Sequence, residues 1–248
     1  MQPGLTIAEC EKVLVAAGTD LTLIGGQAVS LWAEEFETEL NLAEKHTSKD
    51  IDFWGDRQLL TRLAKKLDTV AKYPDMRSFT VLSGILQLWA GGKHLKVDVL
   101  HSVPGVPDAD WDRITIVVES KVGPVRTLDP ISLIGSKLHN LKNFDQSERQ
   151  DLNQLLICLK IARIFLARAL REDIRRGLTY VKRLLDIACM GNNQAVFKEH
   201  KIPIFDAVPI QTIEHFATDN TVPDDARERL NNFLTIRWAQ IKANGFVA

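Results

Sequence analysis

The sequence predicts an α+β protein, in which a mixed β-sheet with flanking helices is followed by a bundle of helices. Short apolar segments separated by glycine turns recur up to residue 128, which is typical of strands and hairpins. Helical patterns alternate with them. From Pro130 onward apolar residues recur at helical spacing over long stretches. We therefore predict an α/β domain over residues 1–128 and a helical domain over residues 129–248.

Composition limits the classes of partner. The 248 residues, 45% of them hydrophobic, are enough for a sizeable core, and 31 basic side chains balance 32 acidic ones. A net charge of −1 gives no general attraction to nucleic acid or membrane, so a polyanion site must be local. The three dispersed cysteines fit reduced core thiols. With no signal segment or long apolar run, we expect a cytoplasmic protein without a membrane partner.

The N-terminal part predicts a helix, a strand, a glycine turn and a second helix. Thr6 and Glu9 form a capping box for the first helix, and the apolar run 21–24 predicts the strand. Gly25 and Gly26 follow the strand directly. Small residues at such a turn let backbone amides approach phosphate oxygens, although a tight turn that needs positive φ is an alternative explanation.

Two acids stand on the next predicted strand, residues 50–54. Asp50 and Asp52 alternate there with apolar Ile51 and Phe53, so the two carboxylates share one face. That spacing suits a hard cation such as Mg²⁺. The alternative is an amphipathic edge strand with two solvated acids.

The following segments predict a helix over 57–73 and two hairpins, 85–90 with 95–100 and 114–118 with 125–128. The strand 95–100 carries a single acid, Asp98, whose burial is costly unless it is paired, hydrogen-bonded or bound to a metal. If this strand lies beside that of Asp50 and Asp52, the three carboxylates converge in the arrangement used for two-metal nucleotidyl transfer. An ion pair with Lys96 is the alternative for Asp98.

The helical half begins at Asp129, a predicted helix cap, and includes the segments 131–141, 149–170, 173–189 and 227–243. It also carries a basic run, for which an RNA-binding face and a solvated helix face interrupted by acids are both open. The run consists of Arg163, Arg168, Arg171, Arg175, Arg176, Lys182 and Arg183.

The order of these motifs resembles that of the DNA polymerase β-like nucleotidyltransferase superfamily. Within it the sequence is most similar to the AbiEii-type proteins of abortive-infection and toxin–antitoxin systems, whose Gly-Gly-x-Ala and Ser-x-Asp-Ile-Asp-Phe motifs match residues 25–28 and 48–53. The Lys-x-Asp strand of the family matches Lys96 to Asp98, and two softer matches are a Ser-Lys-Leu helix at 136–138 and a last element around Asp151. The chain departs from the family around that last element, at Gln150 and at 153–154. No P-loop or Rossmann fingerprint is present in the sequence.

The resemblance implies an NTP-dependent enzyme that holds two Mg²⁺ ions and moves an NMP to a hydroxyl of RNA, protein or a small molecule. It further implies a toxin with a cognate antitoxin partner. The alternative is a catalytically idle binding protein of the same fold, against which the three intact aspartates speak.

The resemblance also assigns roles to individual residues. The implied metal ligands are Asp50, Asp52 and Asp98, and Asp98 would complete the second ion site or deprotonate the acceptor. Lys137 would neutralise triphosphate charge, with a solvated lysine as the alternative. Ser48 would bond the triphosphate or merely close its loop. The implied nucleotide-binding residues are Gly25, Gly26, Ser48, Lys137 and Asp151.

Overall fold

The structure is a computed structural model that describes residues 4–42, 46–75, 77–90, 92–106, 111–147 and 149–245. The chain divides into two compact units, Met1–Cys158 and Leu159–Ala248. Strands end at Leu128, as the sequence predicts, but the first unit extends beyond the predicted domain boundary. The reason is that α6 (Pro130–Asn143), the first helix after the sheet, packs against α2 (Gly25–Glu35) of the same unit.

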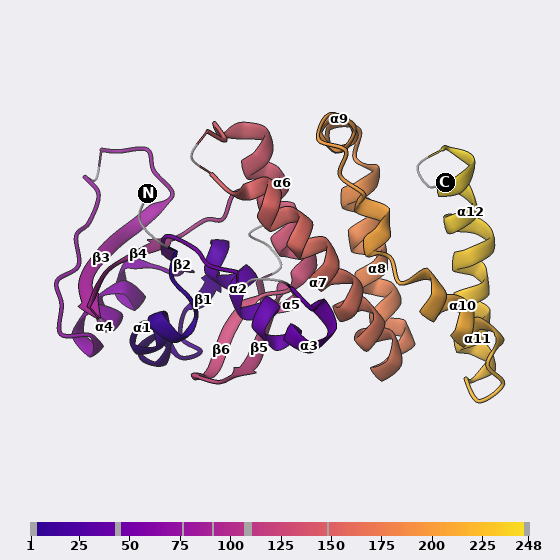
Figure 1. The fold of residues 1–248 in the computed structure, drawn as a ribbon, viewed down its shortest axis with the longest axis horizontal. Coiled ribbons are helices and arrows are strands. Elements are labelled where there is room, and N and C mark those ends of the chain that lie inside the picture. Colours follow the sequence, from indigo (N-terminus) through magenta and orange to yellow (C-terminus); the bar gives the residue numbers. More distant parts are fainter. Residues whose placement is uncertain are drawn as a thin grey trace. The chain divides into compact units, whose positions relative to one another are not determined.

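The first unit contains a six-stranded mixed sheet in the order β3-β4-β2-β1-β6-β5 (Figure 1). β1 is antiparallel to β2 and parallel to β6, and β2 is parallel to β4. Both predicted hairpins, β3–β4 and β5–β6, are present, although the turn residue Gly91 lies outside the described residues. The strands are β1 Thr22–Ile24, β2 Ile51–Trp54, β3 Leu82–Ala90, β4 Lys93–Leu100, β5 Thr115–Ser120 and β6 Gly123–Leu128.

The helices of this unit flank the sheet, and their predicted caps are observed. The Thr6 amide donates to the Glu9 carboxylate at 2.8 Å, and Asp129 caps α6 by accepting from the Ser132 amide at 2.7 Å. The predicted helix 57–73 is too long, because α4 ends at Lys66 and Asp68 adopts a φ of +51°. The remaining helical elements are η1 Ala8–Cys10, α1 Glu11–Ala17, α3 Glu37–Leu40, α4 Arg57–Lys66 and α5 Trp111–Ile114. Helix α7 (Asp151–Glu172) begins in this unit, which ends at Cys158.

The central strand β2 shows the predicted alternation. Ile51 and Phe53 are fully buried in the core, whereas Asp52 and Trp54 point to the opposite, partly accessible face. Asp50 lies on the bend just before the strand and not within it. One face of β2 therefore stabilises the fold while the other is available for polar chemistry.

The second unit is helical among its described residues, as predicted. The predicted helix 227–243 is a composite of α11, a π-helical segment and α12. No helix of the described chain has the length and apolar character to cross a bilayer. The elements after α7 are α8 Ile174–Cys189, α9 Gly191–Glu199, η3 Ile204–Ala207, α10 Ile210–Thr218, α11 Asp224–Asn232, η4 Phe233–Trp238 and α12 Ala239–Ala243.

Candidate active site

The turn between β1 and α2 is built from two glycines that have no room for a side chain. Gly25 has a φ of +68°, and a Cβ there would lie 2.2 Å from the Asp52 carboxylate. A Cβ on Gly26 would lie 2.2 Å from the Ser48 hydroxyl oxygen. The positive φ of Gly25 confirms the tight-turn explanation, and the approach of its backbone to phosphate oxygens stays a prediction. The first turn of α2, which has no side-chain cap, lies directly against Asp52 and Ser48.

The two acids from different strands are neighbours. In the parallel pairing of β2 with β4, Asp52 is in register with Asp98, so their side chains lie on the same face of adjacent strands. Adjacent strands are about 4.8 Å apart. The sequence-based condition for convergence, that these two strands lie side by side, is therefore met.

Asp52 lies in a strongly negative environment. Burial, the charge of Asp98 and, to a smaller extent, that of Asp50 raise the pKa of Asp52 to about 7, because Lys137 and Lys96 offset only part of these effects. A cation bound at this position would relieve the repulsion among the three acids.

Asp98 forms the ion pair that the sequence left as an alternative, but the pair satisfies only one of its oxygens. Lys96 Nζ lies 2.7 Å from Asp98 Oδ2. Asp98 Oδ1 is buried and accepts no hydrogen bond from the described part of the chain. A buried carboxylate oxygen without a donor is costly unless a ligand supplies a positive partner.

The oxygen donors around Asp52 and Asp98 are of the type that Mg²⁺ prefers. Within the described ranges, no three His, Cys, Asp or Glu side chains are arranged as a ready-made metal site. Mg²⁺, however, keeps several waters and is commonly held by one or two carboxylates together with substrate phosphates. Asp52 and the unpartnered oxygen of Asp98 fit that requirement, with Asp50 at the edge of the same cavity. Binding of two Mg²⁺ ions by Asp50, Asp52 and Asp98 stays a prediction.

Lys137 faces the acids from α6, and it is buried, with 4% of its surface exposed, so the solvated-lysine alternative is wrong. Its Nζ lies 3.4 Å from Asp151 Oδ1, to which Asn140 also donates, while Arg149 donates to Oδ2 at 2.5 Å. Burial acts to raise the pKa of Asp151, but these partners outweigh it and hold the pKa below its usual value. Asp151 thus holds Lys137 in place, while its predicted nucleotide contact stays untested.

Ser48 is fixed through its backbone. Its amide and carbonyl pair with those of Leu5 at 3.1 and 2.7 Å, and Gln27 donates to the Leu5 carbonyl at 2.9 Å. Nearby, His46 Nδ1 lies 2.8 Å from the Ser30 hydroxyl, and burial lowers the pKa of His46 to about 4. The Ser48 backbone thus holds the loop against Leu5, its hydroxyl lies beside Gly26, and a bond from that hydroxyl to the triphosphate stays a prediction.

All eight predicted site residues line one cavity of about 620 Å³, which lies wholly within the first unit. The sequence reasoning missed Asn140, Phe144 and Gln154, which line it too. The first two follow Lys137 at helical spacing, and that periodicity could have found them. The predicted residues are Gly25, Gly26, Ser48, Asp50, Asp52, Asp98, Lys137 and Asp151.

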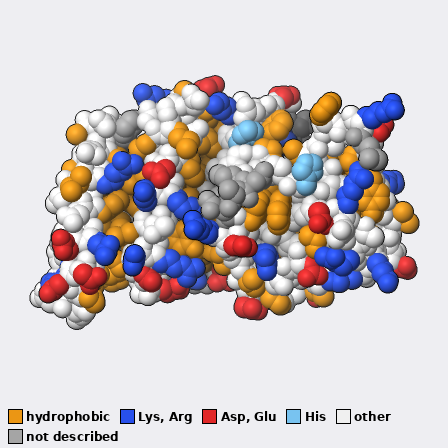
Figure 2. Space-filling model, turned by 180° about the vertical axis from the view of Figure 1, so that it is seen from behind, with side chains coloured by type: hydrophobic (Ala, Val, Ile, Leu, Met, Phe, Trp, Pro, Cys, Tyr) orange, Lys and Arg blue, Asp and Glu red, His pale blue; other side chains and the backbone are white. Residues whose placement is uncertain are grey.

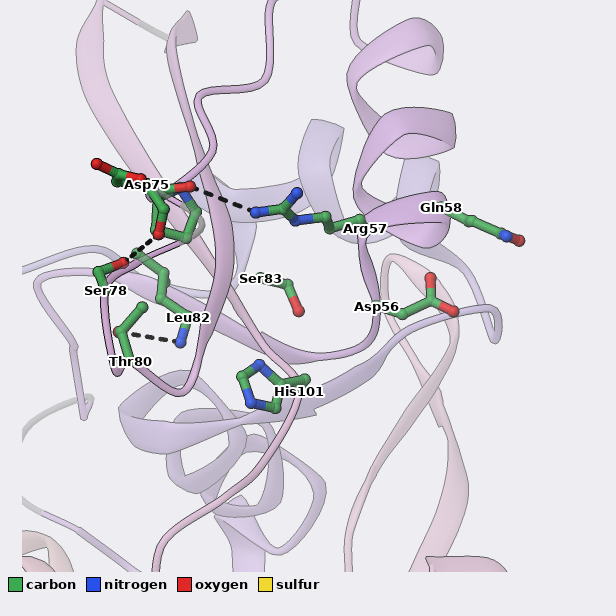
Figure 3. A pocket seen from close by; sticks show the side chains of 10 residues that line it. Asp56, Arg57, Gln58, Asp75, Ser78, Thr80, Leu82, Ser83 and His101 are labelled. Atoms are coloured by element: carbon green, nitrogen blue, oxygen red, sulfur yellow. Dashed lines mark hydrogen bonds between the residues drawn. The ribbon is translucent and has the colours of Figure 1, made fainter.

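A second hollow of about 460 Å³ lies at the opposite end of β2, around the start of α4. Figure 3 shows Arg57 reaching across it to the loop that carries Asp75 and Ser78, where its guanidinium donates to the Pro74 carbonyl at 3.3 Å. Ser83 also donates to a backbone carbonyl. These polar groups already have protein partners, and none of the predicted site residues lines this hollow.

No family model matches the sequence, and no curated protein matches it. Among solved structures, the chain is similar to an antigenic nucleotidyltransferase-like protein from Paracoccidioides brasiliensis, with 13% identity and a TM-score of 0.44. The match covers 72% of this chain and 94% of that protein. A likeness this distant does not indicate an activity, which leaves the cavity and its residues as the evidence for function.

Proposed function

We propose that the protein is a metal-dependent nucleotidyltransferase that moves an NMP from an NTP to an acceptor hydroxyl. The observation that carries this proposal is the pairing of Asp52 with Asp98 directly against the glycine turn of α2. Lys137 adds a buried positive charge to the wall of the same cavity. Carboxylates for a metal ion and cationic groups for phosphates are the parts that nucleotidyl transfer requires.

The chain's own residues would divide the work as follows. Asp50 and Asp52 would hold Mg²⁺, which when bound neutralises charge on the triphosphate. Lys137 and the first-turn amides of α2 would bind phosphate oxygens. The acceptor oxygen forms a bond to the α-phosphorus, the bond from that phosphorus to the β-bridging oxygen breaks, and pyrophosphate leaves. Asp98, through its unpartnered Oδ1, would take the acceptor proton or complete a second ion site.

The motif resemblance supports a narrower form of the proposal, a cytoplasmic AbiEii-type toxin with a cognate antitoxin. The acceptor is RNA, a protein or a small molecule. The basic run of α7 and α8 adds little support for RNA as the acceptor. The guanidinium groups of Arg176 and Arg183 already have a protein partner, because each lies 5.7 Å from the centroid of the Tyr180 ring. Figure 2 shows basic side chains interspersed with acidic and apolar ones over the face that it presents.

The test is a transfer assay with Mg²⁺ and NTPs labelled at either the α- or the γ-phosphate, sorted by acceptor fraction. Label should move from the α-phosphate only, because γ-label leaves with pyrophosphate. Asp52→Asn and Asp98→Asn should each lower transfer at least about 100-fold, the scale of losing a metal ligand or general base. Asp68→Asn is the matched control, since Asp68 is exposed and Asn tolerates its positive φ.

The idle-protein alternative predicts a different pattern. Such a protein would act as a binding protein in a protein complex and would transfer no label to any fraction, with or without the two aspartates. Equal transfer by wild type and Asp52→Asn would exclude the assigned catalytic role.

A further inference from the structure

Phe144 is an exposed aromatic residue on the wall of the polar cavity. It follows α6 directly as its C-cap, lines the cavity and leaves 46% of its surface exposed. Exposed apolar side chains are common on protein surfaces, but among the exposed aromatic residues in the described part of the chain Phe144 is the one that lines this cavity. We propose that the base of the bound NTP stacks on Phe144, an assignment that rests on the proposed function and adds the base subsite to it.

The spacing along α6 fits one nucleotide. Phe144 follows Lys137 by seven residues, which brings it back to the same side of the helix about 10 Å further along the axis. That is the scale of the distance from the triphosphate to the base in an extended nucleotide. A triphosphate at Lys137 would therefore place its base beside the Phe144 ring.

A guanidinium group packs over the Phe144 ring, and 46% of the surface of Phe144 is exposed. The Arg149 guanidinium lies 5.1 Å from the ring centroid, and the same side chain donates to Asp151. The His139 ring is 6.4 Å away and tilted by 60°, so it does not lie flat against Phe144. Asp151 thus links the phosphate-binding Lys137 to the cation that supports the aromatic ring.

Stacking of this kind accepts any base and favours the larger ones, because every base has a π-face and a purine covers more of the ring. The Asn140 side chain donates to Asp151, so that amide already has a protein partner. We therefore assign the substrate class as NTPs held mainly by stacking, with purines bound more tightly than pyrimidines.

Binding calorimetry with Mg²⁺ and two probes tests this assignment. The probes are the α,β-methylene analogue of ATP, which has a base, and inorganic tripolyphosphate, which has none. Phe144→Ala and Phe144→Leu should each weaken the ATP analogue roughly 5- to 100-fold, the range measured for aromatic stacking, and leave tripolyphosphate unchanged. Phe144→Trp, which keeps an aromatic ring, should bind the ATP analogue as tightly as the wild type or more tightly. Phe79→Ala, at a fully exposed phenylalanine outside the cavity, is the matched control.

Two results would overturn the inference and leave the proposed function standing. In the first, Lys137→Gln weakens binding of the ATP analogue, whereas wild type and Phe144→Ala bind it equally well. This result would show that the base does not stack on Phe144. An equal loss for both probes in Phe144→Ala would show that the ring only supports Arg149. If neither probe binds to the wild type, the proposed function itself is contradicted.

Discussion

Asp52 and Asp98 occupy matched positions on the parallel strands β2 and β4, and no described residue donates to the buried Oδ1 of Asp98. Two carboxylates in register repel each other, and the pKa of Asp52, raised to about 7 chiefly by burial and by Asp98, reflects that repulsion. The fold therefore accepts a local instability at the position where a cation would bind.

The first prediction concerns this repulsion. Asp52→Asn should raise the free energy of unfolding by about 1–3 kcal/mol in EDTA, because it removes one of the crowded charges. Millimolar Mg²⁺ should reduce the difference in unfolding free energy between Asp52→Asn and the wild type, because it stabilises the wild type alone. Chemical denaturation with and without Mg²⁺ measures both effects, and a variant less stable than wild type in EDTA would contradict the prediction.

The second prediction concerns the glycine turn. Gly25→Ala should lower the free energy of unfolding by more than Gly92→Ala does, although both residues have positive φ. Strain at such a φ costs about 1–2 kcal/mol in each variant. Only the Gly25 variant adds a steric clash, because its new Cβ would lie 2.2 Å from the Asp52 carboxylate. At Gly92 no atom lies within 4 Å of a new Cβ. Equal losses in the two variants would mean that the turn can shift away from Asp52 freely.

The third prediction separates anchoring from direct binding at Asp151. Asp151→Asn should lower stability by about 3 kcal/mol, because Lys137 loses its buried counter-charge. It should also raise the KM for NTP more than it lowers kcat if Asp151 acts by positioning Lys137. Asp20→Asn, which breaks the exposed pair with Lys66, is the control, with an expected cost below about 1 kcal/mol.

The fourth prediction is a pH dependence that originates at His46. Its pKa is about 4 in the folded protein and 6.5 in the unfolded chain, so between these values the unfolded state binds the extra proton. Stability from this group is complete above pH 6.5 and falls as the pH drops toward 4, by about 2 kcal/mol at pH 5.

His46→Asn should remove this dependence. The difference in unfolding free energy between wild type and variant should therefore shrink by about that amount between pH 7.5 and pH 5. Asp52 titrates in the same range in both proteins, so its contribution cancels in the difference. A difference that stays constant over this range would show that the pKa of His46 is the same in the folded and the unfolded protein.

Local patterns predicted the elements around the site, because alternation, glycine turns and caps act over a few residues. They predicted the capping box at Thr6, the two-faced strand of Ile51 and Phe53, and both hairpins. The sequence predicted that Asp52 and Asp98 are neighbours only on the condition that their two strands pair. α4 and β3 intervene between their strands, and pairing across such a distance depends on the whole sheet.

Other features depended on packing that no local pattern contains. The buried charge of Lys137 is paired with Asp151 on the next helix, and α6 belongs to the first unit because it packs against α2. The early end of α4 at Lys66 ran against a helical pattern that continues to Val70. The position of Phe144 on the cavity wall could have been predicted from its spacing of seven residues after Lys137, but not from its residue type alone.

The parallel pairing of β2 with β4 also has a kinetic consequence. Gly25 and Asp52 belong to the first quarter of the chain, whereas Asp98 and the Lys137–Asp151 pair are synthesised later. Parallel pairing over such a separation carries a large loop-closure entropy and forms slowly. During synthesis on the ribosome, the acids would therefore stay apart and solvated until the later strands arrive. The proposed site would then be complete only when the first unit, Met1–Cys158, has been synthesised, and it does not need the residues of the second unit.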